Sequence, residues 1–416
     1  MEVAAFVIDQ EQDVRVAIVN ESLQEGMGYA GLAIPKTMKK MGVDVHYVTA
    51  GLPVYHTMKD YKAVYGNFHK NRDQPGTSRI IEGYPVHVID FSMGFGGARL
   101  IGLKEKLAEL KPDIVQTFGH VTWPALQSAL YQKELGYRLF TGNHTTASVY
   151  PLAQRKRQSM FDALLWKETL IRKLPGMAIS SRIEACYGAT NDCADVAHRF
   201  MGVPQDKLKM LPLGVETDIF HPAIDDEERA AATRLRRELG VGDDEIMVVY
   251  TGRFTEDKNP LLLAQAIDKL RSSGQPYRAV FFGEGPQRAQ IADFDHAIVR
   301  EFVHYTKLAD LYRAADIGVW PTQESTSMLD CAASGTPIIV NDTIVATERA
   351  EGNGLFYRLN DVNDLVTKLR ILKDPIERHR LGSHGARKIE REFSWRSLVQ
   401  KRLDDYEAAL AADQSA

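Results

Sequence analysis

The sequence predicts an α/β protein with two doubly wound, Rossmann-like domains that face each other across a cleft. Three observations predict this architecture. Short buried strands and helical segments alternate along most of the chain, which is typical of parallel sheets covered by helices. The 416 residues are too many for one hydrophobic core. Residues 320–340 contain a strand end, a polar loop, a small-residue helix and a new strand, which together make one βαβ unit.

Composition excludes several classes of protein. Hydrophobic residues make up 44% of the chain and charged residues 25%, as in ordinary globular proteins, and the net charge of −4 disfavours a nucleic-acid partner. The three cysteines, Cys186, Cys193 and Cys331, form neither an even disulfide framework nor a CxxC metal pair. We expect Cys186 and Cys193 to lie on one helical face and to pack as small apolar groups. Residues 1–15 do not read as a secretory signal, and no apolar run is long enough to span a membrane, so we expect a cytoplasmic protein.

The first domain is expected to cover residues 1–212. It opens with a strand, a loop, a helix and a second strand over residues 14–49. Gly26 and Gly28 lie in that loop, where glycine lets the backbone come close to a ligand. The GMG triplet is not a full GxGxxG motif, so a flexible connection is an equally good interpretation, and a nicotinamide site is disfavoured.

The alternation continues after a polar, basic insertion at residues 55–76. The following elements are predicted in order: paired short strands at 79–91, a helix at 98–113, a strand at 114–119, a helix at 123–136, and strands at 137–143 and 177–181. His120 and His144 fall just past two of these strands, on the side where open sheets bind ligands. A neutral histidine there can hydrogen-bond a sugar hydroxyl, although a packing role is as common for a histidine in a loop.

Residues 150–176 form a long basic helical stretch with apolar residues between its cations, which are Arg155, Lys156, Arg157, Lys167, Arg172 and Lys173. Two interpretations remain open. The favoured one is a solvated basic face over a packed helix. The other is peripheral contact with an anionic membrane surface.

The second domain is expected to cover residues 213–392, and a last segment, 393–416, to form a helix that packs back on the first domain. A buried strand at 246–252 runs into a loop that carries Arg253 and Lys258. Two cations on one loop beside a helix N-terminus suit a diphosphate, although two solvent-facing charges are an equally good interpretation.

The loop within residues 320–340 has the chemistry of a sugar-nucleotide site. Glu324 lies in the loop and Asp330 in the helix that follows. Backbone N–H groups at a helix N-terminus bind phosphate, and nearby carboxylates bind hydroxyls. An ordinary loop whose acidic residues cap a helix is the competing interpretation.

Taken together, the motifs of the second half resemble glycosyltransferase family 4, whose fold is called GT-B. The motifs are GRFTEDKNPLLLAQAI, FFGEGPQR and LADLYRAADIGVWPTQESTSMLDCAASGTPIIV, preceded by LPLGVETDIFHP and followed by FSW with a terminal helix. The resemblance implies a retaining hexosyltransferase. It would move a sugar from a UDP- or GDP-linked donor to a carbohydrate or lipid-linked hydroxyl, in surface polysaccharide or glycolipid biosynthesis, without a metal or other cofactor.

The resemblance also implies roles for individual residues. Arg253 and Lys258 match the cations that bind the donor diphosphate, His144 matches a histidine near the transferred sugar, and Gly26 and Gly28 loosely match a glycine loop. The family's paired glutamates, spaced E-x7-E, become E-x5-D here. Asp330 is expected on the ribose hydroxyls, and Glu324 near the sugar or phosphate. The remaining donor-binding residues are expected to be Gly252, Gly283, Ser325, Thr326 and Ser327.

Other activities remain open at this stage. A nucleotide-sugar epimerase or a phosphorylase can use a related two-domain fold, and a non-catalytic protein can close on a sugar in the same way. An epimerase would form product without an acceptor, and a phosphorylase would need free phosphate. A binding protein would take free sugar without a nucleotide.

Overall fold

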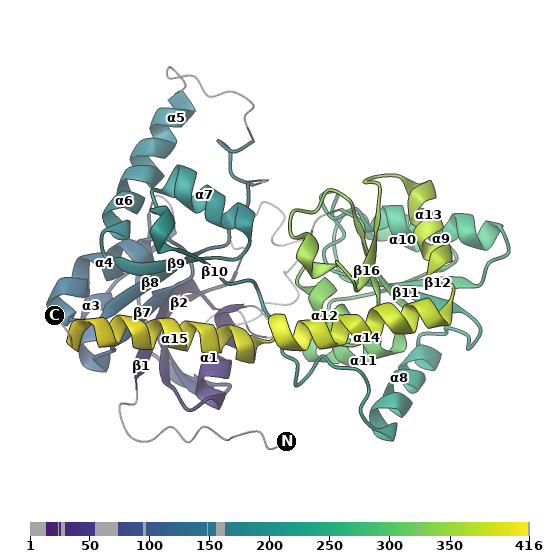
Figure 1. The fold of residues 1–416 in the computed structure, drawn as a ribbon, viewed down its shortest axis with the longest axis horizontal. Helices are drawn as coiled ribbons and strands as arrows, with labels where there is room; N and C mark the ends of the chain where they lie inside the picture. Colours follow the sequence, from purple (N-terminus) through teal and green to yellow (C-terminus); the bar gives the residue numbers. More distant parts are fainter. Residues whose placement is uncertain are drawn as a thin grey trace.

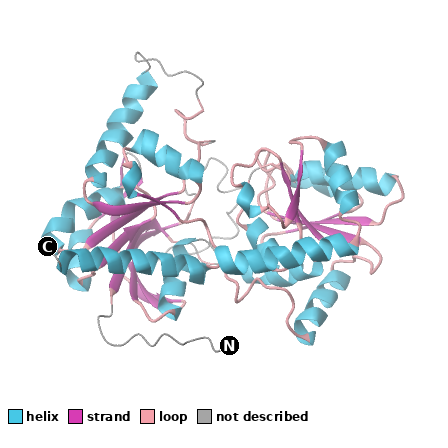
Figure 2. Ribbon diagram, viewed as in Figure 1, coloured by secondary structure: helices cyan, strands magenta, loops and turns pink. Residues whose placement is uncertain are grey.

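The computed structural model describes residues 14–23, 25, 30–54, 74–94, 97–147, 149–154, 163–322 and 324–414. The chain forms two α/β lobes side by side, and helices α14 and α15 run end to end along both of them (Figure 1). Each lobe has a central sheet with helices packed around it (Figure 2). The predicted pair of Rossmann-like domains is therefore confirmed.

The first sheet has eight strands in the order β10-β9-β8-β7-β1-β2-β4-β3, parallel except for the β3–β4 hairpin. Its strands are β1 (Arg15–Ser22), β2 (Asp44–Leu52), β3 (Ser78–Ile81), β4 (Tyr84–Val88), β7 (Ile114–Thr117), β8 (Arg138–Asn143), β9 (Ile183–Gly188) and β10 (Leu208–Met210). A separate hairpin joins β5 (Phe91–Gly94) to β6 (Gly97–Leu100). Alternate residues of β1 enter two different core clusters, so this sheet is buried on both faces.

The second sheet has six parallel strands in the order β13-β12-β11-β14-β15-β16. They are β11 (Ile246–Thr251), β12 (Tyr277–Phe282), β13 (Ala297–Arg300), β14 (Ile317–Trp320), β15 (Ile338–Asn341) and β16 (Gly354–Tyr357). Strand order reverses between β11 and β14, as it does between β1 and β7 in the first sheet. Such a reversal opens a crevice at the carboxyl ends of the strands.

The helices connect the strands in the expected alternation. Those of the first domain are α1 (Ala30–Lys40), α3 (Leu103–Leu110), α4 (Trp123–Leu135), α5 (Ala163–Glu168), α6 (Leu174–Ser180) and α7 (Asn191–Met201). Those that follow are α8 (Asp226–Glu238), α9 (Pro260–Ser272), α10 (Arg288–Ala292), α11 (Leu308–Ala314), α12 (Ser327–Ala333), α13 (Val362–Ile371), α14 (Pro375–Glu392) and α15 (Trp395–Gln414).

The chain passes between the domains at two places that touch each other. Val215 donates its N–H to the carbonyl of Phe393 at 2.8 Å, and Trp395 donates to the carbonyl of Val215 at 3.0 Å. After this crossing α15 packs on α1, and its buried Leu398 and Tyr406 join a core cluster of the first domain. The boundaries at residues 212 and 392 stay predictions.

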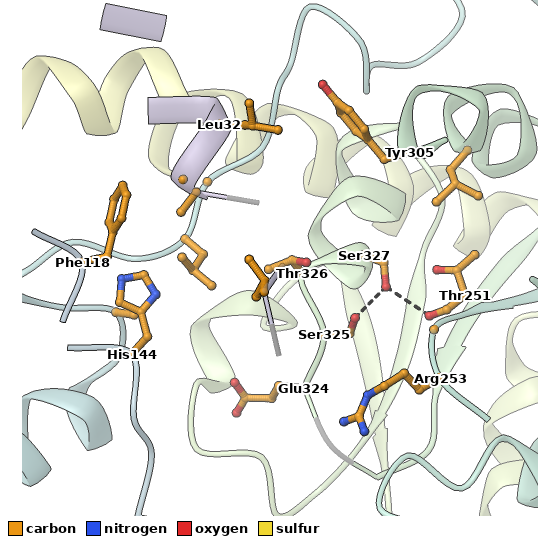
Figure 3. Close-up of a pocket in the computed structure, with 18 of the residues that line it drawn as sticks. Leu32, Phe118, His144, Thr251, Arg253, Tyr305, Glu324, Ser325, Thr326 and Ser327 are labelled. Atoms are coloured by element: carbon orange, nitrogen blue, oxygen red, sulfur yellow. Dashed lines mark hydrogen bonds between the residues drawn. The ribbon is translucent and has the colours of Figure 1, made fainter. Parts of the chain in front are cut away.

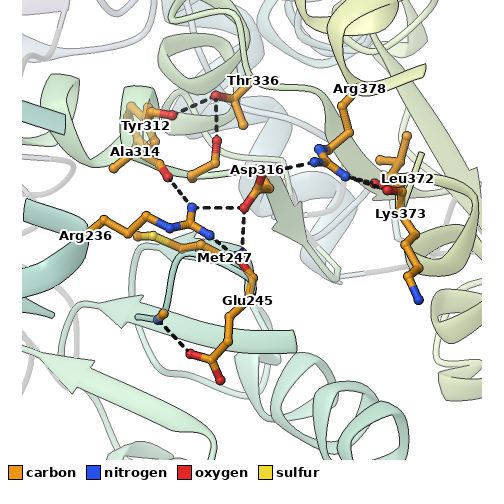
Figure 4. A network of polar contacts seen from close by, with 12 residues as sticks. Arg236, Glu245, Met247, Tyr312, Ala314, Asp316, Thr336, Leu372, Lys373 and Arg378 are labelled. Atoms are coloured by element: carbon orange, nitrogen blue, oxygen red, sulfur yellow. Dashed lines mark hydrogen bonds and ion pairs between the residues drawn. The ribbon is translucent and has the colours of Figure 1, made fainter. Parts of the chain in front are cut away.

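A polar network holds the second domain together at the edge opposite the carboxyl ends of its strands (Figure 4). Asp316, just before β14, accepts hydrogen bonds from the guanidinium of Arg236 at 3.0 Å and from the N–H of Met247 at 2.8 Å. Arg378 of α14 lies 3.3 Å from the same carboxylate. The carboxylate of Asp316 thus joins α8 and α14 to the β11 and β14 strands of the sheet. The opposite edge, at the carboxyl ends of the strands, is left free for the site.

Three predicted assignments are wrong. Residues 177–181 are not a strand, because they largely complete α6, which follows a π-helical turn at Thr169–Lys173. The helix expected from residue 98 begins only at Leu103, because Gly97–Leu100 pairs with the preceding strand. Cys186 and Cys193 do not share a helix, since they lie in β9 and α7, although both are buried free thiols.

Some predictions lie outside the described residues. They concern Gly26 and Gly28, most of the insertion at 55–76, and the basic residues Arg155, Lys156 and Arg157.

Candidate active site

A cavity of about 570 Å³ lies between the two domains, at the carboxyl ends of both sheets. We call it the interdomain cavity. From the first domain it is lined by Asn20, Ser22, Tyr47, Phe118, His144, Thr146 and Thr190, among others. From the second it is lined by Gly252, Arg253, Lys258, Tyr305, Arg349 and residues 324–327, among others. Figure 3 shows Phe118 and His144 on one side of it and Arg253, Glu324 and Ser325 on the other.

His144 is part of the first-domain wall. Its ring meets the edge of Phe118 with the ring centroids 6.3 Å apart. His144 is exposed to the cavity, and desolvation by the protein around its ring, with a smaller contribution from Arg402, lowers its pKa. The imidazole is therefore neutral near pH 7, with one nitrogen as donor and the other as acceptor. A neutral imidazole at this wall suits a hydroxyl group.

His120 is a packing residue. Its side chain is buried, and its ring nitrogens lie 2.9 Å from Thr141 Oγ1 and 3.0 Å from the carbonyl oxygen of Gly176. Burial lowers its pKa to about 4. This histidine joins β7 to its neighbours and does not line the interdomain cavity.

Arg253 and Lys258 both line the interdomain cavity from the loop between β11 and α9. Arg253 makes a 2.9 Å ion pair with Asp257, and Lys258 donates to the carbonyl oxygen of Glu324 at 2.6 Å. Burial and the nearby Arg253 lower the pKa of Lys258 to about 8, although Asp257 and Glu324 oppose the shift. The charge of Arg253 disfavours the charged form of Lys258, and an anion that contacts both side chains would relieve this repulsion, so the loop is suited to bind one.

Glu324 is held by a residue that the sequence did not indicate. One carboxylate oxygen accepts the N–H groups of Val345 and Ala346, both at 3.1 Å. The other lies 3.0 Å from Arg349, whose side chain is 5% exposed. Arg349 also lines the interdomain cavity, and its Nε is buried with no hydrogen-bond partner in the described part of the chain. Arg349 belongs to no recognised motif and follows Glu324 by 25 residues, so only the fold brings the two together.

Three residues with hydroxyl side chains lie at the start of α12. Ser327 Oγ donates to the carbonyl oxygen of Thr251 at 3.2 Å and lies 2.7 Å from Ser325 Oγ. The indole N–H of Trp320 also points at Ser327 Oγ, at 3.0 Å. Ser325, Thr326 and Ser327 all line the interdomain cavity, so the loop presents hydroxyl groups beside the two cations.

Asp330 and Gly283 are not among the described residues that line the interdomain cavity. Burial, reinforced by Glu216, raises the pKa of Asp330 well above its ordinary value. Gly283 allows the loops after β11 and β12 to pack closely, since a Cβ there would lie 1.8 Å from the carbonyl oxygen of Gly252. Gly252 itself, with a φ of +147°, does line the cavity. The donor-binding roles assigned to these residues stay predictions.

Two facing Rossmann-like domains with a cationic loop in the crevice between them define the GT-B class of glycosyltransferases. Family comparisons agree: residues 32–219 match the model described as Glycosyltransferase Family 4, and residues 245–374 match the model described as Glycosyl transferases group 1. Together the two matches cover about three quarters of the chain. The chain belongs to glycosyltransferase family 4.

Curated relatives are similar at low identity. The chain is 25% identical over 399 residues to the sulfoquinovosyl transferase SQD2 of Arabidopsis thaliana, with 84% of this chain and 71% of the relative covered. It is 28% identical over 251 residues to the D-inositol 3-phosphate glycosyltransferase of Xylanimonas cellulosilytica, with 54% and 57% covered. The chain thus covers 71% of the length of the first relative and 57% of the length of the second.

Solved structures share the fold across nearly the full chain. A glycosyltransferase from Rickettsia africae superposes with a TM-score of 0.70 at 15% identity, with 95% of this chain and 98% of the other covered. Anabaena Alr3699/HepE, solved with UDP and glucose, superposes with a TM-score of 0.67 at 12% identity, with 94% and 98% covered. Such likenesses show the fold alone.

Proposed function

We propose that the protein transfers a sugar, with retention of anomeric configuration, from a nucleoside diphosphate sugar to a hydroxyl acceptor. The observation that carries the proposal is the pair Arg253 and Lys258, which line the interdomain cavity from one loop opposite His144. A diphosphate neutralises both cations at once, and the hydroxyl groups of residues 325–327 lie on the same wall.

The proposed chemistry follows from where charge develops. As the bond between the anomeric carbon and the diphosphate oxygen breaks, its electron pair passes to the diphosphate, where Arg253 and Lys258 stabilise the growing charge. The acceptor oxygen attacks the anomeric carbon from the face that the diphosphate leaves, and its proton passes to the departing phosphate oxygen. Glu324 takes no nucleophilic role in this scheme, because Arg349 and two backbone N–H groups already engage its carboxylate. His144, neutral near pH 7, hydrogen-bonds the sugar.

Similar proteins support the choice of donor and acceptor classes. Anabaena Alr3699/HepE has been solved with UDP-glucose, and the Arabidopsis relative is a sulfoquinovosyl transferase. We propose a UDP- or GDP-linked hexose as donor and a carbohydrate or lipid-linked hydroxyl as acceptor, in polysaccharide or glycolipid synthesis. In the described residues no cluster of three or more His, Cys, Asp or Glu side chains could hold a metal. Independence from metals stays a prediction, and loss of activity in EDTA that added Mg²⁺ restores would contradict it.

A thermal-shift screen with nucleoside diphosphates and their sugar conjugates tests the proposal, because a bound donor raises the apparent stability. Arg253→Ala is expected to abolish the shift and to lower transfer by about two orders of magnitude. Arg288→Ala is the matched control: Arg288 also follows a second-domain strand and pairs with an acid four residues away, but it does not line the interdomain cavity. Equal donor binding by both variants would overturn the proposal. An epimer formed without acceptor would identify an epimerase instead.

A further inference from the structure

A helical arm of the first domain exposes an apolar face. The arm comprises α5, the π-helical turn and α6, residues 163–180, and α5 projects away from the domain (Figure 1). Its most exposed large side chains are Trp166, Leu170, Leu174 and Met177, with exposed fractions of 59%, 60%, 50% and 52%. They recur every three or four residues and so lie along one side of the arm. We call this stripe the arm face.

The arm face reverses the usual pattern of a surface helix. The opposite side of the arm carries the buried residues Glu168, Gly176 and Ile179, which face the domain. A surface helix normally turns polar side chains to solvent, as α8 does with its runs of Glu and Arg. Here leucine, tryptophan and methionine occupy the outer stripe. Large apolar side chains gathered on an outer surface mark an interaction site.

Positive charge flanks the arm face. Lys167 and Lys173 are exposed, and no described carboxylate lies within ion-pair distance of either. Two other described cations nearby are neutralised: Arg172 pairs with Glu168 at 2.9 Å, and Arg199 pairs with Asp195 at 3.0 Å. A hollow lined by Lys173, Met177 and Arg199, among others, lies beside the stripe. Apolar side chains with lysines at their flank match the boundary between the headgroups and acyl chains of an anionic bilayer.

We propose that the arm face inserts into the surface of a membrane that contains anionic lipid. The apolar stripe enters the acyl boundary, and Lys167 and Lys173 lie at the level of the phosphate groups. Insertion is peripheral, because none of the helices in the described ranges is long and apolar enough to cross a bilayer.

The arm also lies near the first-domain wall of the interdomain cavity. Helix α7 packs against two parts of the arm, the π-helical turn and α6. Thr190 and Cys193, at the start of α7, line the cavity, and its last turn reaches the hollow beside the arm face. The helix has 11 residues, which corresponds to a length of about 16 Å. A hydroxyl carried by a lipid in the same membrane is therefore within reach of the cavity; this last step rests on the proposed function, whereas membrane binding does not.

Sedimentation with lipid vesicles, in the absence of any donor, tests the proposal. The vesicles contain either phosphatidylcholine alone or phosphatidylcholine with phosphatidylglycerol. The full chain is expected to sediment with the anionic vesicles and to be released by high salt. Leu170→Glu with Leu174→Glu is expected to lower the partition coefficient at least tenfold. Lys167→Gln is expected to lower it about fivefold, the contribution of one lysine near an anionic surface.

The matched control is Ile224→Glu with Ile376→Glu, since these isoleucines are 75% and 77% exposed and lie in the second half of the chain. This variant is expected to sediment like the unmodified protein. Equal loss in both double variants, or no sedimentation of the unmodified chain, would overturn the proposal. So would a fall in molecular mass on Leu170→Glu and Leu174→Glu, because it would identify the arm face as a contact between two copies of the chain. If the Leu170→Glu and Leu174→Glu variant keeps its thermal shift with donor, the proposed donor binding stands whatever the sedimentation result.

Discussion

Lys258 combines burial, a neighbouring cation and an anionic ligand in the proposed site. Its pKa of about 8 means that the free enzyme loses this charge above pH 8. We expect kcat/KM for the donor to fall above pH 8, with a loss that approaches about tenfold per pH unit. Lys258→Arg is expected to remove this alkaline limb, because a guanidinium stays charged throughout. A limb that is the same in both enzymes would contradict the assignment.

The same shift has an opposite effect on folding. Lys258 has its ordinary pKa near 10.5 in the unfolded chain and about 8 in the folded one, so between these values the unfolded chain binds more protons. Its contribution to the free energy of unfolding therefore rises with pH across that window. As the pH rises above 8, loss of the proton from Lys258 is thus expected to weaken donor binding, while the contribution of Lys258 to folding stability rises.

At the site, the sequence could predict only residues that lie a short, fixed distance after the end of a strand. Arg253 and Lys258 follow β11 directly, so a sequence that marks the strand also marks the cations. Arg349 could not be found in this way, because its position follows from how the segment after β15 folds back over the loop of Glu324. Asp330 lies in the expected helix but is not among the described residues that line the cavity, so its role at the ribose stays a prediction; a helix predicted by pattern does not say which side faces a ligand.

Strands could be predicted where burial on both faces of a sheet leaves a short run of mostly apolar residues in the sequence. The β11, β12 and β14 strands are mostly apolar runs, as expected for strands buried on both faces, with Arg278 in β12 as the charged exception. Residues 177–181 were wrongly assigned to a strand from the same feature, a short run of mostly apolar residues. A short apolar run has no period of its own, and here most of it completes a helix, in which Ile179 and Ser180 are buried and Met177 is exposed. The exposed stripe on that helix was likewise visible only once the fold showed which side faces outward.

Close packing of two loops sets the position of the proposed diphosphate cations. Gly283 follows β12, and a Cβ there would lie 1.8 Å from the carbonyl oxygen of Gly252 and 2.9 Å from the ring of Phe254. Gly283→Ala must push the Gly252–Arg253 segment away, so we expect donor affinity to fall at least about tenfold and stability by about 2–4 kcal/mol. Donor titration and thermal unfolding check both values.

Gly242→Ala is the control for that change, because its Cβ would meet nothing closer than 3.6 Å, in the side chain of Glu245. We expect Gly242→Ala to bind donor like the unmodified protein. If Gly283→Ala also binds donor normally, the β12 loop does not position the cations.

At the scale of the whole molecule, the sequence predicted two domains and a cleft but not the contacts that join the domains. A buried cluster of polar side chains lies at this junction. Lys36 of α1 lies 2.6 Å from a carboxylate oxygen of Glu216, next to the crossing segment. Tyr305 of the second domain donates its hydroxyl to the other oxygen of Glu216, also at 2.6 Å. Burial lowers the pKa of Lys36, but the hydrogen bond and charge of Glu216, with a contribution from Glu82, more than offset this and raise it. Lys36, Glu216 and Tyr305 are far apart in the sequence, and of the three only Glu216 lies within a recognised motif, LPLGVETDIFHP.

Loss of the lysine from this cluster is expected to weaken the junction between the domains. The side chains of Lys36 and Glu216 are only 11% and 7% exposed, so Lys36→Met leaves a buried carboxylate without its cation and should destabilise the protein by about 3 kcal/mol. Lys40→Met is a control on the same helix: Lys40 pairs with Asp218 of the same crossing segment, but those side chains are 53% and 64% exposed, so the expected loss is under about 1 kcal/mol. Lys36→Met with Glu216→Gln should regain much of the stability, because the uncompensated charge is gone. Urea unfolding measures all three variants, and equal midpoints for Lys36→Met and Lys40→Met would show that the buried pair does not hold the domains together.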